Sequence, residues 1–308
     1  MVQFFNLGHI ILLTSTLVIL GATILVFALW LRKYPLASKI TIMAILFIGF
    51  VVHFLRLAFP PPGHRFPAAY QYISPMSISA FNAITFFFIF LFGNKMWKDY
   101  MFYMGFLTGL LAMLMPVTAY GRATGSFDAI RFFIIHGIIA LAPILMIISG
   151  HHHTSWKRAF LAPFAILIVL AVILINEVML TALGVIDQSM GQLLSHETRN
   201  GALVFGPEPR GGFATVVFDA LTPKVFKTAL FGIPSLGISP GDTLFWPVIW
   251  ILVPGTIIFV PASLIMGIAT DPKRFIRDMK IFWYWMTRQH EKRVKINPKK
   301  FSKLKTHS

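Results

Sequence analysis

Residues Phe132–Gly150 read FFIIHGIIALAPILMIISG, a run long enough to cross a bilayer, for which about 20 apolar residues suffice. Its only ionisable side chain is His136, which lies inside the run. Pro143 follows on roughly the same helix face, and its missing N–H predicts a local bend or opening of the helix. An imidazole is costly in lipid and usually faces the bundle interior or a wet cavity. His136 is therefore a candidate functional residue, and a buried structural histidine is the alternative.

The composition places this run in a polytopic membrane protein. The chain has 308 residues, of which 56% are hydrophobic and 12% charged, and its mean hydropathy is +0.74. A soluble domain would carry about a quarter charged residues. The absence of cysteine excludes disulfides, thiolate nucleophiles and cysteine-bound metals. The sequence indicates no cofactor and no metal site.

Seven apolar segments reach or exceed the length of a bilayer span. They lie approximately at residues 9–31, 39–58, 70–93, 100–119, 130–149, 159–184 and 244–269. We therefore expect an all-α membrane bundle of about seven transmembrane helices over residues 1–270, followed by a basic tail over 271–308. The first run lacks a preceding basic region, so it is typical of a transmembrane helix rather than a signal peptide.

The sixth and seventh segments are separated by residues 185–243, which is too long for a simple connector. Apolar and charged residues alternate irregularly between Phe213 and Phe231. This mixture predicts one or two short helices lying on the membrane surface.

Basic residues in the short loops predict the orientation of the chain. They follow the first, third and fifth spans and comprise Arg32, Lys33, Lys39, Lys95, Lys98, Lys157 and Arg158. Because such loops remain in the cytoplasm, we expect a cell-membrane protein with its N-terminus outside and its C-terminus in the cytoplasm. Four arginines on the other side weaken this asymmetry: Arg56, Arg65, Arg122 and Arg131.

The tail carries much of the formal net charge of +16, with twelve of the 27 Lys and Arg residues lying between Asp271 and Ser308. A polybasic segment beside a final span predicts contact with anionic lipid headgroups. Nucleic acid is the less common partner of such a tail, and we expect none. The sequence does not indicate an oligomeric state.

The predicted orientation brings several polar residues to one leaflet. His136 lies in the outer half of its span, and the third span begins in the same leaflet with Ser74 and Ser77. We expect these side chains to face one another. Asp128 and Arg131 are three residues apart at the mouth of the fifth span, as in a simple ion pair or a polar entrance above His136.

Three consecutive histidines, His151 to His153, follow the fifth span. Their imidazoles cannot all converge on one metal ion from a regular helix. A solvated helix end is the expected arrangement.

Three stretches follow the order and spacing of a known bacterial family: Ser74–Ala80 (SPMSISA), Phe102–Pro116 (FYMGFLTGLLAMLMP) and Arg131–Gly137 (RFFIIHG). They resemble the YwaF-like integral membrane proteins, which are related to transmembrane protein 164 of animals, an acyltransferase. Asn200–Pro209 and Trp246-Pro247 also resemble the last external loop and final helix of that family. The resemblance covers roughly residues 40–270.

This resemblance implies acyl transfer between membrane phospholipids, with a cysteine in the third helix and a histidine in the fifth. His136 matches the histidine. Bacterial members typically read HxCSIS, whereas this chain has Ser74 at the histidine of that motif and Met76 at the cysteine. A thioether cannot act as an acyl nucleophile, so Ser77 or Ser74 is the candidate substitute, provided that an adjacent base activates it.

Two functions therefore remain open. In the first, His136 is the general base of an acyltransferase, and Asp128 is the candidate third residue that orients it. In the second, the protein is non-catalytic and binds lipid or moves a small solute, and the serines are helix-packing residues. The candidate substrate-binding residues are Arg131, Asn200 and Trp246.

Overall fold

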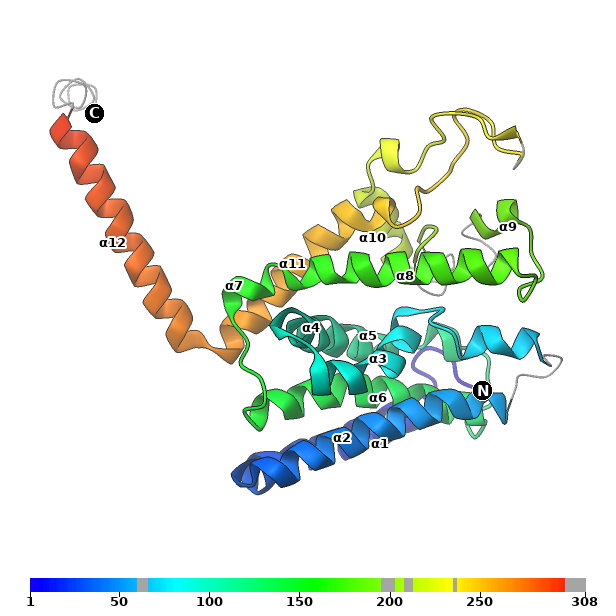
Figure 1. Ribbon diagram of the computed structural model, residues 1–308, viewed down its shortest axis with the longest axis horizontal. Coiled ribbons are helices and arrows are strands. Elements are labelled where there is room, and N and C mark those ends of the chain that lie inside the picture. Colours follow the sequence, from blue (N-terminus) through cyan, green and yellow to red (C-terminus); the bar gives the residue numbers. More distant parts are fainter. Residues whose placement is uncertain (60–65, 195–202, 208–212, 235–236, 297–308) are drawn as a thin grey trace.

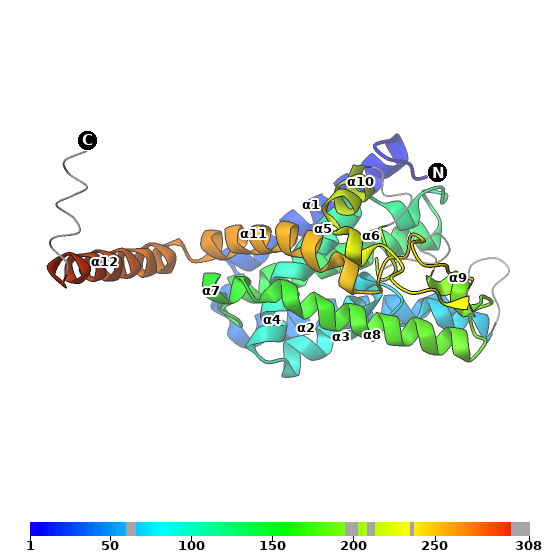
Figure 2. The same cartoon turned by 90° about the horizontal axis from the view of Figure 1, so that it is seen from above.

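The computed structural model describes residues 1–59, 66–194, 203–207, 213–234 and 237–296. Within these ranges the regular structure is helical and contains no strand. Long helices lie alongside one another in a bundle, and α12 (Pro272–Ile296) projects from one end of it (Figures 1 and 2). The predicted all-α membrane helix bundle is confirmed.

The long helices of the bundle are α1 (Leu7–Leu29), α2 (Pro35–Phe54), α3 (Ile78–Phe92), α6 (Phe127–Ile148), α8 (Ala162–Ala182) and α11 (Leu252–Thr270). A further rod consists of α4 (Lys95–Tyr100), the π-helix η4 (Met101–Gly105) and α5 (Phe106–Leu114). Shorter pieces connect them, including η2 (Leu55–Leu57), η3 (Ala68–Tyr72), η5 (Val117–Ala119), α7 (Trp156–Ala159) and α9 (Met190–Leu194).

Five helical stretches of the described chain are long and apolar enough to cross a membrane. They are Leu7–Lys33, Pro35–Leu57, Phe127–Ile148, Trp156–Ala182 and Ile249–Thr270. The other two expected spans appear as the 15-residue α3 and as the rod interrupted by η4. The predicted count of seven is therefore not confirmed.

The third span starts later than the sequence predicted, at Ile78 rather than near residue 70. Ser77 is extended, and its side chain accepts a hydrogen bond from the Ala80 N–H, so it caps the helix. Pro75 precedes it, and the ring of a proline restricts the residue before it to non-helical conformations. Ser74 and Met76 consequently lie in a turn ahead of α3 rather than on the helix.

Helix α6 lies at the centre of the bundle, where it contacts α1, α2, α3 and α5. Within its apolar window 67% of the residues are buried, compared with 6% for the span that begins with α1. The helix continues through Pro143 without a break in its assignment, and the bend predicted there stays a prediction. The apolar run Phe132–Gly150 therefore lies almost entirely in the most enclosed of the five candidate spans.

Glycine allows α5 to lie close against α6. A Cβ added at Gly109 would lie 2.8 Å from the backbone oxygen of His136 and 3.0 Å from the backbone nitrogen of Ala140. Only a residue without a side chain permits this approach, as is typical of helix contacts in membranes.

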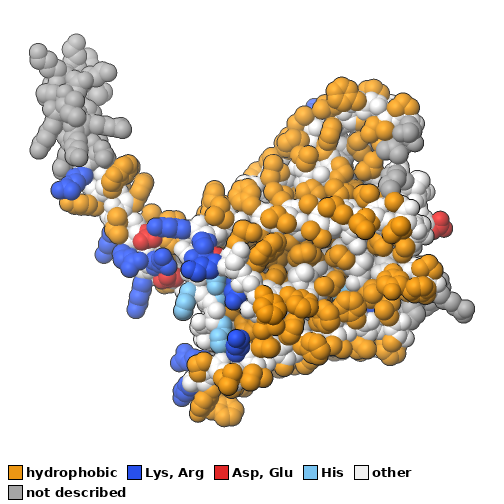
Figure 3. Space-filling view, in the orientation of Figure 1, with side chains coloured by type: hydrophobic (Ala, Val, Ile, Leu, Met, Phe, Trp, Pro, Cys, Tyr) orange, Lys and Arg blue, Asp and Glu red, His pale blue; other side chains and the backbone are white. Residues whose placement is uncertain are grey.

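Lysines and arginines gather at the end of the bundle from which α12 emerges (Figure 3). At this end Asp278 of α12 accepts a hydrogen bond from Trp156 Nε1 at 3.2 Å and pairs with Lys157 Nζ at 3.0 Å. These contacts join the start of α12 to α7. The charge asymmetry on which the topology was predicted is present, and which end faces the cytoplasm stays a prediction.

The long loop between α8 and α11 contains α10 (Phe213–Leu221) and the short 3-10 helix η6 (Lys224–Phe226), in agreement with the short helices predicted there. Trp250, which is fully buried, donates to the Leu203 carbonyl at 2.9 Å and ties the loop to the bundle. The position of these helices on a membrane surface stays a prediction.

Candidate functional site

His136 lies on α6 and is 6% exposed. Its Nδ1 is 2.7 Å from the carbonyl oxygen of Phe132, one turn earlier, and its ring centroid is 4.1 Å from that of Phe132. A carbonyl only accepts, so Nδ1 carries the proton and the ring's Nε2 is an acceptor. This tautomer leaves the lone pair of Nε2 as the one that a general base would use, and the ring is enclosed by the bundle.

Ser77 has a structural role at the start of α3. Its Oγ accepts the Ala80 N–H at 3.1 Å and lies 3.2 Å from the Ser79 hydroxyl. An N-cap of this kind stabilises a helix by about 1 kcal/mol. The hydroxyl is therefore engaged by its own helix.

Ser74 links the turn before α3 to α8. Its hydroxyl donates to the Gln71 carbonyl at 2.8 Å and accepts from Asn176 Nδ2 at 3.2 Å. Met76, which the resemblance aligns with a cysteine, lies in the same turn, and its N–H donates to the Ser74 carbonyl at 2.7 Å.

The structure shows no hydrogen bond between His136 and Ser74 or Ser77 in the described part of the chain. The ring is bonded to its own helix, and both hydroxyls have other partners. The catalytic pairing therefore stays a prediction, and the described contacts do not assemble it.

Asp128 belongs to a larger charged cluster than the expected pair with Arg131. Its carboxylate lies 2.6 Å from Arg122 Nη1, 3.4 Å from Arg56 Nε and 3.6 Å from Arg131 Nε. Arg56 also lies over the ring of Tyr72, 4.4 Å from its centroid. The partners shown for Asp128 are arginines, while the proton-bearing nitrogen of His136 is bonded to Phe132, so these contacts do not make Asp128 the residue that orients the imidazole.

The other two predicted substrate-binding residues lie on the long loop and beside it. Trp246 donates from Nε1 to the Thr228 carbonyl at 3.1 Å, and its backbone N–H donates to the Phe226 carbonyl at 3.0 Å. These bonds hold the loop in place ahead of α11. Asn200 lies outside the described residues, and its predicted role stays a prediction.

A buried polar cluster that was not predicted from the sequence lies at the opposite end of the bundle. Asp99 on α4 accepts hydrogen bonds from Arg158 Nε and, at 2.7 Å, from His152 Nε2. Its side chain is 2% exposed. A signal was available, because Asp99 is the first acidic residue of the chain and sits in a basic loop.

This cluster changes the interpretation of the three histidines. His152 is buried against Asp99, whereas the His151 ring Nε2 lies 2.9 Å from the hydroxyl of Ser38 on α2. Burial, with a smaller effect from the charges of Lys39 and Lys98, lowers the pKa of His151 below its usual value. His153 is exposed, His151 is half-buried and His152 is buried, so the expected solvated helix end is wrong for His152.

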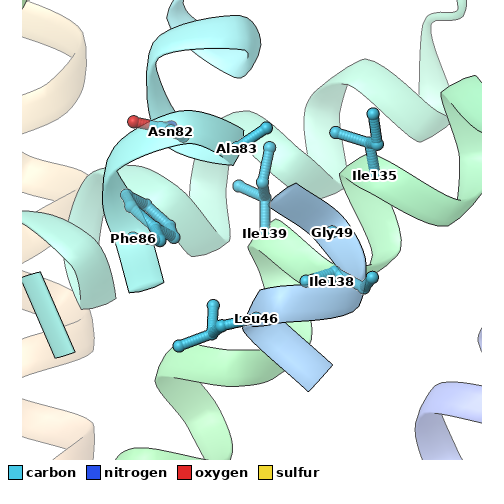
Figure 4. Close-up of a pocket in the computed structure, with 8 residues that line it drawn as sticks. All are labelled: Leu46, Gly49, Asn82, Ala83, Phe86, Ile135, Ile138 and Ile139. Atoms are coloured by element: carbon cyan, nitrogen blue, oxygen red, sulfur yellow. The ribbon is translucent and has the colours of Figure 1, made fainter. Parts of the chain in front are cut away.

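Asn82 on α3 was also missed. Its Oδ1 accepts from the Tyr100 hydroxyl at 2.7 Å, while its Nδ2 is buried without a hydrogen-bond partner among the described residues. It lines a cavity of about 10 Å³ between α2, α3 and α6 (Figure 4). A similar cavity of about 10 Å³ lies between α8 and α11. Each has the volume of about one water molecule, so neither holds an acyl chain.

The comparison with known families decides the identity of the bundle. A sequence profile of the TMEM164 family matches residues 4–202. The chain belongs to the TMEM164 family. The matched part of this TMEM164-family protein runs from α1 through α9 and includes Ser74, Ser77 and His136. Helices α11 and α12 lie beyond it. The predicted YwaF-like subgroup stays a prediction. No curated protein and no solved structure matches the chain.

Proposed function

We propose that this TMEM164-family protein binds membrane phospholipid without transferring its acyl chain. The proposal rests on the residues found where the family resemblance places reactive side chains, and on the contacts that those residues make. The resemblance aligns Met76 with the family cysteine, while Ser77 caps α3 and Ser74 bonds to Asn176. A serine nucleophile needs a base within about 2.6–3.2 Å. The hydrogen bonds shown for these two hydroxyls are to backbone groups, to the Ser79 hydroxyl and to Asn176, and none of these is a base.

Purified protein tests this function directly. The full chain is reconstituted in vesicles that contain a phospholipid labelled on its acyl chain and an unlabelled lysophospholipid. We expect labelled phospholipid to remain bound to the protein through detergent extraction, and the label to stay on the donor lipid at the rate of protein-free vesicles. Protein that retains no phospholipid would contradict the binding, and protein-dependent transfer of label would contradict the absence of turnover.

Acyl transfer itself is the second candidate, favoured by the tautomer of His136. With Nδ1–H bonded to the Phe132 carbonyl, Nε2 is available to accept a proton. The hydroxyl of a lysophospholipid would then attack the ester carbonyl of the donor, and its proton would pass to Nε2. The departing lysophospholipid oxygen takes this proton as the old ester bond breaks. Such direct transfer needs neither Ser74 nor Ser77.

The His136→Gln variant separates the two candidates in the same vesicle assay. Under the proposed binding function the variant retains lipid and shows the same background transfer as the wild type. Under acyl transfer it loses about 10²–10⁴-fold in rate, the usual contribution of a positioned acid or base. The thermal stability of the same preparation is measured alongside, so that loss of fold is not mistaken for loss of chemistry.

Helix α12 supports a second contact with lipid, as the composition of the tail predicted. At 100° per residue, one face carries Phe275, Ile276, Met279, Phe282, Trp283 and Met286. The opposite side carries Lys273, Arg274, Arg277, Lys280 and Arg288. An amphipathic basic helix beside a final span is typical of a segment that lies on an anionic membrane surface.

Neutralising three of these charges should weaken this contact. Because the chain has no native cysteine, Met286→Cys gives a unique site for an environment-sensitive dye on the apolar face. We expect a blue shift in anionic but not neutral bilayers. In the triple variant Lys273→Gln, Arg277→Gln and Lys280→Gln, helix α12 should bind the surface of anionic bilayers about 100-fold more weakly, since each charge contributes about 1 kcal/mol. Equal shifts in neutral and anionic bilayers would contradict the electrostatic contact.

A further inference from the structure

Arginines surround the first turn of α6 at the end of the bundle opposite α12. Arg122 lies in the loop before the helix, and Arg131 lies one turn inside it. Both pair with Asp128, at 2.6 Å and 3.6 Å respectively. In the described part of the chain, one carboxylate therefore serves two guanidinium groups, and Arg56 of η2 approaches the same carboxylate.

The positive charge at this place is largely removed from water. The side chain of Arg131 is 13% exposed, and its buried Nε lies 3.6 Å from Asp128 Oδ1, which is too far for a hydrogen bond and leaves both atoms unbonded in the described structure. The side chain of Arg122 is 36% exposed, so the cluster has one accessible edge. An excess positive charge in such surroundings is costly unless an anion compensates it. The N-terminal end of the α6 dipole adds to the positive potential.

The backbone holds Arg122 in position. Its carbonyl accepts the Val2 N–H at 2.7 Å, and the neighbouring Gly121 N–H donates to the Val2 carbonyl at 2.8 Å. Val2 is itself fully buried. The backbone of Arg122 is therefore held in place, and pairing with Asp128 orients the guanidinium groups of both arginines.

We propose that Arg122 and Arg131 form a binding site for the phosphate group of a phospholipid. Guanidinium groups recognise phosphate oxygens through paired N–H donors, and an acceptor on Arg131 Nε would satisfy its buried donor. The site lies at the end of a membrane-spanning helix, which is the level of the lipid headgroups. A lipid phosphate reaches this depth with its acyl chains along the apolar helix surfaces. The assignment rests on the proposed lipid-binding function and names the part of the protein that holds the headgroup.

Binding is measured on the full chain in detergent with three soluble probes. These are a short-chain phosphatidylglycerol, the matching diacylglycerol without phosphate, and inorganic phosphate. We expect phosphatidylglycerol to bind and to raise the thermal unfolding temperature, while diacylglycerol does not. The double variant Arg122→Gln and Arg131→Gln should bind phosphatidylglycerol about 100-fold more weakly, because each charged hydrogen bond is worth about 10-fold or more. Asp128 keeps Arg56 as its partner in this variant.

Two further variants guard against a merely structural effect. Arg32→Gln removes an exposed arginine at the other end of the bundle and should leave binding unchanged. Asp128→Asn removes the competing carboxylate and should tighten binding of phosphatidylglycerol, whereas a structural ion-pair cluster predicts loss of stability and no gain in affinity.

The outcomes distinguish the source of the phosphate. Inorganic phosphate that binds while phosphatidylglycerol does not would overturn the lipid assignment. Equal binding of phosphatidylglycerol by the wild type and the double variant would overturn the site but leave the proposed function in place. A wild-type protein that retains no phospholipid at all would overturn the proposed function itself.

Discussion

Replacing Gly109 with leucine should prevent α5 from packing against α6. Even the first atom of the new side chain would lie 2.8 Å from the His136 carbonyl oxygen, 3.0 Å from the Ala140 nitrogen and 3.2 Å from the Ala140 Cβ. Two of these three neighbours are backbone atoms of α6, so they cannot rotate away as a side chain would. Relief therefore requires the two helices to separate.

The expected result is a large loss of stability. Overpacking a core costs about 1–3 kcal/mol and more where backbone must move, which for a chain of this length corresponds to a fall in unfolding temperature of about 2–5 °C or more. The measurement is thermal unfolding of the detergent-purified protein, together with the yield of folded protein. Gly109→Ala should lie between leucine and the wild type.

Gly21 provides the matched control. It lies on α1 in the same kind of apolar helix, and a Cβ added there meets nothing within 4 Å. Gly21→Leu should therefore unfold at the wild-type temperature. Equal unfolding temperatures for Gly109→Leu and Gly21→Leu would contradict the close α5–α6 contact.

Replacing Arg158 with methionine should leave the buried carboxylate of Asp99 without its arginine partner. Asp99 accepts hydrogen bonds from Arg158 and His152, and its side chain is 2% exposed. Without Arg158, the carboxylate has only the imidazole as a partner in the described structure. Breaking a buried pair by removing one partner typically costs about 3–5 kcal/mol. Thermal unfolding in detergent should show a correspondingly large decrease.

Removing the second charge should restore part of this loss. The double variant Arg158→Met and Asp99→Asn no longer buries an unpaired carboxylate, so it should be more stable than Arg158→Met alone. Lys157→Met is the matched control, because Lys157 is the neighbouring residue, is 60% exposed and pairs with Asp278 at 3.0 Å. Loss of the exposed Lys157–Asp278 pair should lower the free energy of unfolding by less than about 1 kcal/mol. Additive effects of the two cluster substitutions would show that Asp99 and Arg158 do not act as a pair.

The sequence alone determined the class of the protein and the position of its central helix. Chain length, apolar runs and the scarcity of charge are local properties, and each helix that crosses a bilayer must satisfy its own backbone within one continuous segment. For this reason Phe132–Gly150 could be recognised as a span, and His136 as an enclosed residue within it. The late start of α3 could also have been read locally, from Pro75 and the capping hydroxyl of Ser77.

Only the tertiary structure decided the polar contacts. Asp99 is bonded to residues 53 and 59 positions away, and Asp128 is approached by Arg56 from another helix. The hydroxyl of Ser74 bonds to Asn176 and that of Ser77 to the start of α3, and the sequence predicted neither contact. Hydropathy specifies that a helix is buried, but the partner of a buried polar group depends on how helices distant in sequence rotate and approach one another. That arrangement is settled by packing across the whole bundle, so no single segment encodes it.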